Sequence, residues 1–219
     1  MHLCHDFRIP FLPRAQSIPR SVRPVSNNPM TLTLPPGTSG LFGYGSLLLR
    51  SSMERTLGRP YPDAPAVATI RGWRRTWDSI YPNQRFYFEP SAGEKCYPAH
   101  IIYLNIRRDP AATLNGLIYV VSPDDLARFD EREAVYDRIR IDEDVIEPTV
   151  TGGPVYAYVG KAGFLLERPV PRSEAAVRAS YLSIVDEGLR DLGPAFRQQY
   201  ERSTDQPPAG SIVDDRIDT

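Results

Sequence analysis

The amino-acid sequence predicts an α+β protein built on a small, mixed and mostly antiparallel β-barrel with flanking helices. Runs of β-branched and aromatic residues recur along the chain, and several of them alternate as half-buried strands do. Most of these runs precede the longer helical patterns, an order that favours a barrel with outer helices over a doubly wound sheet. The length of 219 residues suffices for one substantial core.

The first predicted elements surround a glycine-rich stretch. A buried strand is expected to end at residues 41–42, and Gly43-Tyr44-Gly45-Ser46 follows it directly. Because glycine has no Cβ, the chain can turn sharply here. Ser51 and Glu54 then have the spacing of a capping box, which predicts a short helix ending near Gly58.

The middle of the chain predicts three more strands, in residues 66–77, 100–106 and 114–121. Gly72 interrupts the first of them and indicates a β-bulge or a close backbone contact. Residues 79–98 have the broken pattern of a long loop or irregular hairpin over the surface. The sequence Arg108-Asp109-Pro110 predicts a turn between the last two strands.

The last part of the chain predicts three helices and two strands. The first helix begins at Ser122 or Pro123, with acidic residues in its first turn where the helix dipole favours them. Strands are expected at residues 136–146 and 155–159. The longest helix is expected over residues 173–192, and a short helix containing Phe196 and Tyr200 is expected to follow Gly193-Pro194.

The expected domain organisation is one folded domain between two flexible ends. Residues 1–38 are rich in proline and arginine, so this segment is predicted to be a disordered arm. Alternatives are that translation starts at Met30 instead of Met1, or that the segment is a transit peptide. Residues 39–203 form the predicted domain, and residues 204–219 a flexible tail.

Composition excludes several classes of function. A formal net charge of −1 gives no broad attraction to nucleic acid, and no apolar run is long enough to span a membrane. The two cysteines, Cys4 and Cys96, lie far apart, which fits the reducing cytoplasm. With three histidines in the whole chain, we expect no metal site.

The glycine-rich stretch is a candidate binding site for an anion. Backbone amides at a strand-to-turn junction can hold a carboxylate or a developing oxyanion. We therefore consider residues 43–47 as a possible cradle, with a simple tight turn as the alternative. Ser46 is also available as a helix cap.

Glu133 is the candidate catalytic acid. At about 100° per residue it falls on the helical stripe of Leu126 and Phe129, whereas Glu131 and Arg132 point away from it. If that stripe meets the core, the Glu133 carboxyl is carried inward, and burial raises its pKa toward neutrality as a general acid/base requires. The alternative is a structural ion pair with Arg138 or Arg140.

Other polar residues have simpler explanations. Tyr136 and Arg138 either line the same cavity as Glu133 or pack as ordinary strand residues. Cys96, beside Lys95, is either an activated thiol or a plain loop cysteine. The basic and aromatic run at residues 71–77 alternates like a sheet surface, which argues against a nucleic-acid site.

Two of these motifs together resemble the γ-glutamylcyclotransferase-like superfamily, which includes γ-glutamylamine cyclotransferases, a butirosin-pathway relative and AIG2-like proteins. Phe42-Gly43-Tyr44-Gly45-Ser46-Leu47 is similar to its Tyr-Gly-Ser/Thr-Leu loop. Phe129-Asp130-Glu131-Arg132-Glu133-Ala134, with Tyr136 and Arg138 after it, resembles its Leu-Asp-x-x-Glu-Gly…Tyr-x-Arg element. Similar family segments occur, in order, at residues 71–74, 115–119, 155–159 and 181–182.

The resemblance implies a small mixed barrel and a cofactor-independent enzyme that acts on a small γ-glutamyl substrate. The α-amine of a γ-glutamyl amine or peptide attacks its own γ-carbonyl, which yields 5-oxoproline and releases the amine. By the same resemblance, Glu133 moves the protons, and Gly43, Tyr44, Gly45, Ser46, Leu47 and Tyr136 bind the substrate. A pocket that holds the α-amine close to the γ-carbonyl, with backbone N–H donors that stabilise the oxyanion, supplies much of the rate enhancement of such a cyclisation.

The sequence departs from the family pattern at Ala134, where glycine is usual. If that position needs a positive φ, alanine displaces Glu133.

A silent family member that binds an acidic metabolite or a protein partner is one alternative function. An esterase or amidase with Ser46 as nucleophile is another, although His100 is the one histidine in the predicted domain. Residues 79–98, with Tyr81, Arg85, Tyr87 and Tyr97, are expected to border the leaving group. Neither the released amine nor the oligomeric state can be derived from the sequence.

Overall fold

The computed structural model describes residues 31–218. The predicted arm and the question of Met1 or Met30 fall on residues 1–30, outside the described residues. Residues 31–38, which were assigned to the arm, belong to the fold. Strand β1 (Thr31–Thr33) pairs in parallel with β9 (Thr149–Thr151), and the Leu34 amide donates to the Thr151 carbonyl at 2.8 Å. The folded chain therefore includes residues ahead of position 39.

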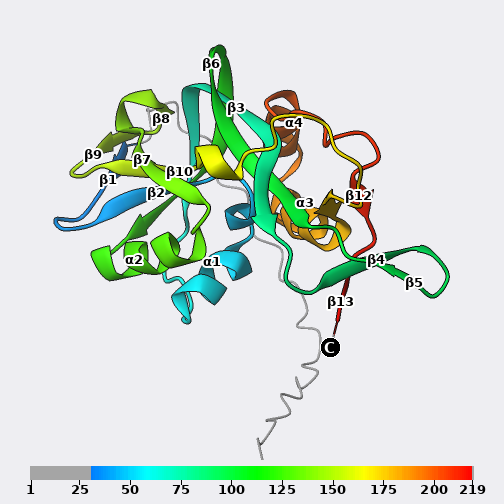
Figure 1. Ribbon diagram of the computed structural model, residues 1–219. Coiled ribbons are helices and arrows are strands. Elements are labelled where there is room, and N and C mark those ends of the chain that lie inside the picture. Colours follow the sequence, from blue (N-terminus) through cyan, green and yellow to red (C-terminus); the bar gives the residue numbers. More distant parts are fainter. Residues whose placement is uncertain (1–30, 219) are drawn as a thin grey trace, which may run out of the picture.

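Two long antiparallel strands form the centre of the molecule (Figure 1). Strand β3 spans Ala66–Pro82 and β6 spans His100–Val121. The predicted separation of β6 into two strands is wrong, because β3 remains paired with both halves. Arg71 pairs with Thr113, whereas Trp73 pairs with Arg108. Residues 109–112 thus form a bulge opposite Gly72, as the sequence indicated. The φ of Gly72 is 76°, in the left-handed region.

The remaining strands extend this pair into a curled, mixed sheet, as the α+β prediction requires. Strand β2 (Ser39–Gly43) lies between β6 and β10 (Val155–Gly160), antiparallel to the former and parallel to the latter. Strand β7 (Tyr136–Arg140) flanks β10, and β8 (Val145–Glu147) pairs with β3. The expected strand over residues 136–146 is therefore two strands, separated by the 3₁₀ turn Asp142–Asp144.

Four α-helices are present among the described residues: α1 (Arg50–Leu57), α2 (Pro123–Arg132), α3 (Ala179–Leu192) and α4 (Pro194–Arg202). Helix α2 begins at Pro123, one of the two predicted starts, and the Ser122 hydroxyl caps it. The predicted capping box of α1 is wrong, since the helix begins at Arg50 and no side chain caps it. Gly58 ends α1 in the left-handed conformation, as expected.

The longest helix begins six residues later than predicted, because the chain first adds a strand. Strand β11 (Ala175–Arg178) lies in parallel beside β6 and beside β12 (Ile212–Val213). Its backbone groups are satisfied by the sheet, so the helical pattern starts only at Ala179. Two further short segments, Ser46–Leu48 and Ala162–Phe164, are 3₁₀ turns.

The segment expected to be a long loop or irregular hairpin is a hairpin, and the segment expected to be a flexible tail pairs with it. Strands β4 (Phe86–Ser91) and β5 (Glu94–Cys96) form a hairpin, and β13 (Arg216–Ile217) adds to β4. Asp218 accepts hydrogen bonds from Lys95 and Tyr97, each at 2.7 Å. The described part of the C-terminal segment is thus tied to the body by strand pairing and ion pairs.

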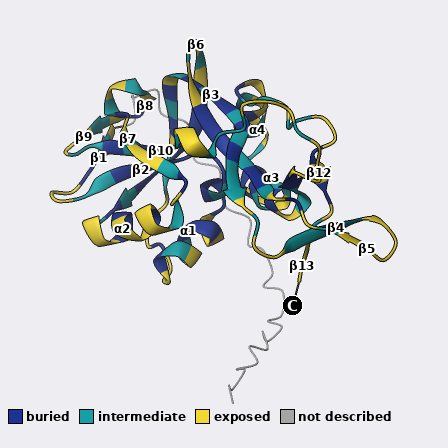
Figure 2. Cartoon of the chain, in the orientation of Figure 1, coloured by how far each residue is buried: buried dark blue, intermediate teal, exposed yellow. Residues whose placement is uncertain are grey.

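The core lies between the curled sheet and the helices, where Figure 2 shows the inner faces as buried. Leu41 and Phe42 of β2, Tyr119 of β6 and Phe129 of α2 are at most 1 % exposed. Because β2 is buried here, its end and the loop that follows are held rigidly against β6 and β10.

Candidate functional site

The loop after β2 presents backbone amides that the local structure does not use. Leu48 and Leu49 donate to the carbonyls of Gly45 and Ser46, at 2.9 and 3.2 Å. The amides of Gly45, Ser46 and Leu47 precede these first helical hydrogen bonds and so have no partner within the turn. Ordered N–H groups of this kind are suited to bind an anion.

Gly45 packs closely against a side chain of α3. A Cβ at this position would lie 2.9 Å from the hydroxyl oxygen of Tyr181, which belongs to α3. The side chains of α3 therefore approach the loop closely enough to share a cavity with it. Tyr181 was expected on the apolar face of its helix, and it is indeed 9 % exposed.

A fully buried arginine supports the same loop from behind. Arg75 on β3 donates from Nε to the Tyr44 carbonyl at 2.8 Å, and its other nitrogens bind Ser203, Thr204 and the Asn115 carbonyl. It is 0 % exposed and forms no ion pair with a carboxylate of the described residues. Burial lowers its pKa to about 10. The sequence pattern placed this residue on a sheet surface, and its role was missed.

Glu133 lies at the C-terminal end of α2. Its amide donates to the Phe129 carbonyl at 2.8 Å, and Phe129 is completely buried beneath it. The inward stripe of α2 therefore meets the core, and the Glu133 side chain is 19 % exposed. Ala134, the departure from the family pattern, needs no positive φ, because no non-glycine residue among those described has one.

These two segments line one cavity of about 50 Å³. All the residues to which the family resemblance assigned a role in catalysis or substrate binding contribute to it: Gly43, Tyr44, Gly45, Ser46, Leu47, Glu133 and Tyr136. The remaining lining residues emerge only from the structure: Phe42, Leu104, Tyr158 and Tyr181. We call this space the inner cavity.

The charge of the inner cavity depends on Glu133. Burial raises the pKa of its carboxyl, and the positive charge of Arg132 partly opposes that rise. The Arg132 Nε lies 3.3 Å from the Glu133 Oε1. The alternative ion pairs are wrong, because Arg138 contacts Asp130 at 2.9 Å and Arg140 contacts Asp142 at 2.5 Å. Arg138 is absent from the residues that line the inner cavity.

The tyrosines around Glu133 are fixed donors that remain neutral. The Tyr44 hydroxyl donates to the Tyr158 carbonyl at 2.7 Å, and the Tyr136 hydroxyl donates to the Leu104 carbonyl at 2.9 Å. Burial and the nearby Glu133 carboxylate raise the pKa of both phenols. Their protons are therefore held in place, and Glu133 is the group in the inner cavity best suited to exchange one.

A larger hollow of about 330 Å³, the outer cavity, adjoins the first. The two share Ser46, Glu133, Tyr136 and Tyr181. Arg132, which was expected to point away from the apolar stripe, also lines the outer cavity and donates to the Ser46 hydroxyl at 2.8 Å. Its long side chain reaches back across the helix end, a contact that the angular position of its Cα does not predict.

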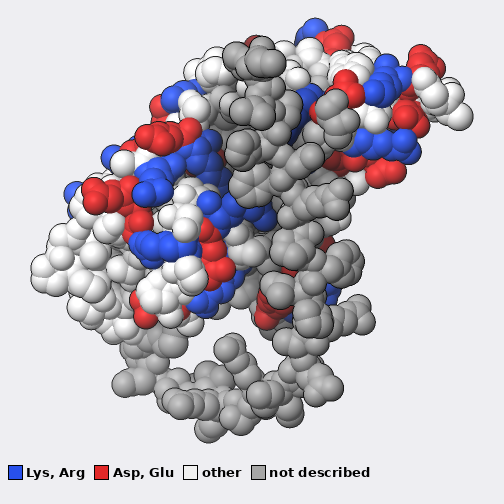
Figure 3. All heavy atoms as spheres, turned by 90° about the horizontal axis from the view of Figure 1, so that it is seen from below, with Lys and Arg blue, Asp and Glu red and all other residues white. Residues whose placement is uncertain are grey.

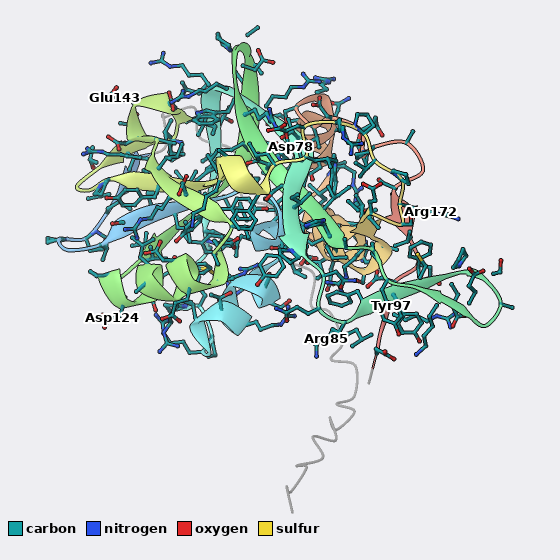
Figure 4. The ribbon with its side chains drawn as sticks, viewed as in Figure 1. Asp78, Arg85, Tyr97, Asp124, Glu143 and Arg172 are labelled. Carbon is teal, nitrogen blue, oxygen red and sulfur yellow. The ribbon has the colours of Figure 1, made fainter. Side chains whose placement is uncertain are left out.

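The hairpin segment contributes less to the site than expected. Tyr81 lines the outer cavity, but Arg85 and Tyr97 lie out at the β4–β5 hairpin (Figure 4). There Tyr97 packs against Tyr87 and bonds to Asp218. The expectation that residues 79–98 border the site is therefore wrong for Arg85, Tyr87 and Tyr97, which line neither cavity.

The alternative chemistries gain no support from the geometry. His100 lies at the start of β6, paired with Ala175, and lines neither cavity, so Ser46 has no imidazole base there. Cys96 is a free, half-buried cysteine in β5. Within residues 31–218, no group of three histidine, cysteine or acidic side chains is placed to hold a metal ion. No helix of this part is long and apolar enough to cross a membrane.

Solved structures share this arrangement of elements. YkqA from Bacillus subtilis superimposes with a TM-score of 0.51 at 18 % identity, over 79 % of this chain and 56 % of its own. A γ-glutamyl cyclotransferase gives 0.49 at 16 % identity, over 80 % of this chain and 94 % of its own. With a TM-score above 0.5, YkqA shares the fold of this chain. A yeast γ-glutamyl cyclotransferase specific to glutathione gives 0.47 at 11 % identity, over 77 % and 97 % of the two chains.

Sequence comparison adds nothing to this result. No family model matches the chain, and no curated protein does. At identities this low, the likeness to solved structures concerns the fold, and the chemistry has to be argued from the residues of the site.

Proposed function

We propose that the protein is a γ-glutamyl cyclotransferase that converts a γ-glutamyl amine or peptide to 5-oxoproline and a free amine. The single observation that supports the proposal is the shared inner cavity, which Glu133 and residues 43–47 line together. A proton acceptor and an anion cradle around one small space are what an intramolecular acyl transfer needs.

In the proposed mechanism Glu133 carries both protons. Its carboxylate takes a proton from the substrate α-ammonium, and the α-amine nitrogen then bonds to the γ-carbonyl carbon. The carbonyl oxygen becomes an oxyanion, which the amides of Gly45, Ser46 and Leu47 stabilise. As the oxyanion collapses, the bond to the leaving nitrogen breaks and Glu133 returns its proton to that nitrogen. The ring nitrogen then loses its second proton to the Glu133 carboxylate, which passes it to the released amine, so that the lactam is neutral and the amine leaves as an ammonium ion.

The buried surroundings suit these roles. A carboxyl with a raised pKa exchanges protons near neutral pH more readily than an exposed one. Arg75 holds the carbonyl of the Tyr44–Gly45 peptide, so the Gly45 amide in the same peptide plane keeps a fixed orientation. The proposed reaction uses no cofactor, and we place the enzyme in the cytoplasm.

Release of 5-oxoproline from a panel of γ-glutamyl amino acids, peptides and amines tests the proposal. We expect the parent protein to form product and Glu133→Gln to lower kcat by about a hundredfold or more, within the usual range for general acid–base catalysis. Glu131→Gln is the matched control, because this neighbouring acid is exposed and lines neither cavity.

Two results would contradict the mechanism. Turnover by Glu133→Gln at the parental rate would remove Glu133 from the chemistry. Thermal stabilisation of the parent by γ-glutamyl compounds, with no product from any of them, would instead identify a silent member that binds its ligand in the same cavity.

A further inference from the structure

In the proposed mechanism, the outer cavity is the space available to the leaving group. It shares Glu133 and Ser46 with the inner cavity, so it begins where the reacting bond has to lie. Its volume of about 330 Å³ is within the usual range for small-molecule sites, whereas the inner cavity has room for little beyond the reacting atoms.

The lining of the outer cavity is strongly basic. Arg55, Arg132 and Arg178 contribute to it, and Glu133 is the one acidic residue among its lining. This excess is local: Figure 3, which views the side of α1 and α2, shows acidic and basic side chains interleaved over the described surface. The chain as a whole carries a formal net charge of −1.

Two of the three arginines already have partners. Arg132 contacts Glu133, and it donates to the hydroxyls of Ser46 and Thr56 at 2.8 and 3.0 Å. Arg178 contacts Asp215 at 2.9 Å, and the Asp215 side chain is 4 % exposed. Their side chains are thereby held in place at the cavity wall.

Arg55 supplies the uncompensated charge. It lies in the last turn of α1, is exposed, and forms no ion pair with the described residues. Two nearby acids are already engaged, since Glu54 contacts Arg50 at 2.9 Å and Asp125 contacts Arg59 at 2.6 Å. A cation facing a cavity without an acidic partner is available to a ligand anion.

We propose that the released amine carries an anionic group, and that Arg55, with Arg132 and Arg178, selects it. This inference rests on the proposed function and narrows its substrates to γ-glutamyl amino acids or peptides with a free carboxylate on the leaving side. Cationic leaving groups, such as polyamines, are disfavoured by the same arginines. The group bound here belongs to the leaving amine, because the proposed mechanism assigns the amides of the inner cavity to the γ-carbonyl oxygen of the glutamyl part.

The test compares γ-glutamyl-alanine with γ-glutamyl-alaninamide, which differ in one carboxylate on the leaving group, and adds γ-glutamyl-putrescine as the cationic case. We expect kcat/KM for the carboxylate to exceed that for the amide by about fivefold, the effect of one partly exposed ion pair. The preference should shrink in 1 M salt, where the screening length is about 3 Å.

Two arginine variants locate the effect. Arg55→Gln should reduce the carboxylate-to-amide ratio toward one, and Arg55→Glu should shift preference to γ-glutamyl-putrescine. Arg128→Gln is the matched control, because Arg128 is exposed on α2 and lines neither cavity. We expect it to keep the parental ratio.

The outcomes separate this inference from the proposed function. Equal kcat/KM for all three substrates, with 5-oxoproline formed from each, would overturn the inference while the cyclisation stands; the arginines would then serve the glutamyl carboxylate or no ligand. Absence of 5-oxoproline from every substrate would overturn both. A ratio that falls equally in Arg128→Gln would refute the assignment to Arg55.

Discussion

Gly188 provides a direct test of how α3 positions the loop after β2. This glycine lies where α3 packs on the backbone of the 3₁₀ turn, and a Cβ there would come within 2.7 Å of the Leu48 carbonyl carbon and 2.8 Å of the Leu49 nitrogen. Both neighbours are backbone atoms, so no side chain can rotate to make room. Gly188→Ala must therefore move the helix or the loop.

The size of the effect follows from two opposing terms. Removing glycine from a helix interior stabilises by about 1 kcal/mol, whereas overpacking costs about 1–3 kcal/mol. Because backbone blocks the new methyl group, we take the upper end and expect a net loss of about 1–2 kcal/mol. In a domain of this size that lowers Tm by about 2–8 °C.

Thermal unfolding and 5-oxoproline release are the two measurements. We expect Gly188→Ala to lose rate as well as stability, because the displaced turn carries the amides of Ser46 and Leu47. Gly163→Ala is the control, since a Cβ there meets no atom within 4 Å and its φ is not positive. A Gly188→Ala protein as stable as the parent would refute the packing argument.

Two further predictions concern the support and the charge of Glu133. Phe129 is completely buried under the end of α2, so Phe129→Ala should cost about 3–5 kcal/mol in chemical denaturation; a loss below 1 kcal/mol would mean that this helix is not anchored there. Burial raises the pKa of the Glu133 carboxyl in the folded state. The folded parent protein is therefore most stabilised below the pKa of this carboxyl in the unfolded chain, and it loses that stability as the pH rises through the folded-state pKa. Glu133→Gln has no such titration, and its stability relative to the parent should increase from pH 4 to pH 8; a difference that stays constant would argue against the buried carboxyl.

Local sequence signals predicted the elements whose ends are set by their own residues. The Ser122 cap, the left-handed Gly58 and the Gly193–Pro194 break all appear where the sequence indicated. Errors occurred where distant strands decide. Residues 175–178 have a helical pattern but become strand β11, because β6 and β12 offer backbone partners on both sides.

In the candidate site, too, local sequence patterns identified some residues, and others are brought in by elements distant in sequence. Helical spacing alone placed Glu133 on the stripe of Phe129, and the glycines alone indicated a loop with accessible amides. Arg75 and Tyr181 could not be found in this manner, since each reaches the loop from an element far away in sequence. Arg132 was misjudged because angular position describes where a side chain starts, not where a long one ends.

The sequence by itself determined the α+β class, most helix ends and the two segments from which the candidate site is built, because these depend on periodicity and turn chemistry within a few residues. Tertiary structure alone decided that these segments meet around one cavity and that three arginines surround its outer part. Such contacts arise from packing between elements far apart along the chain, and short-range patterns carry no record of them.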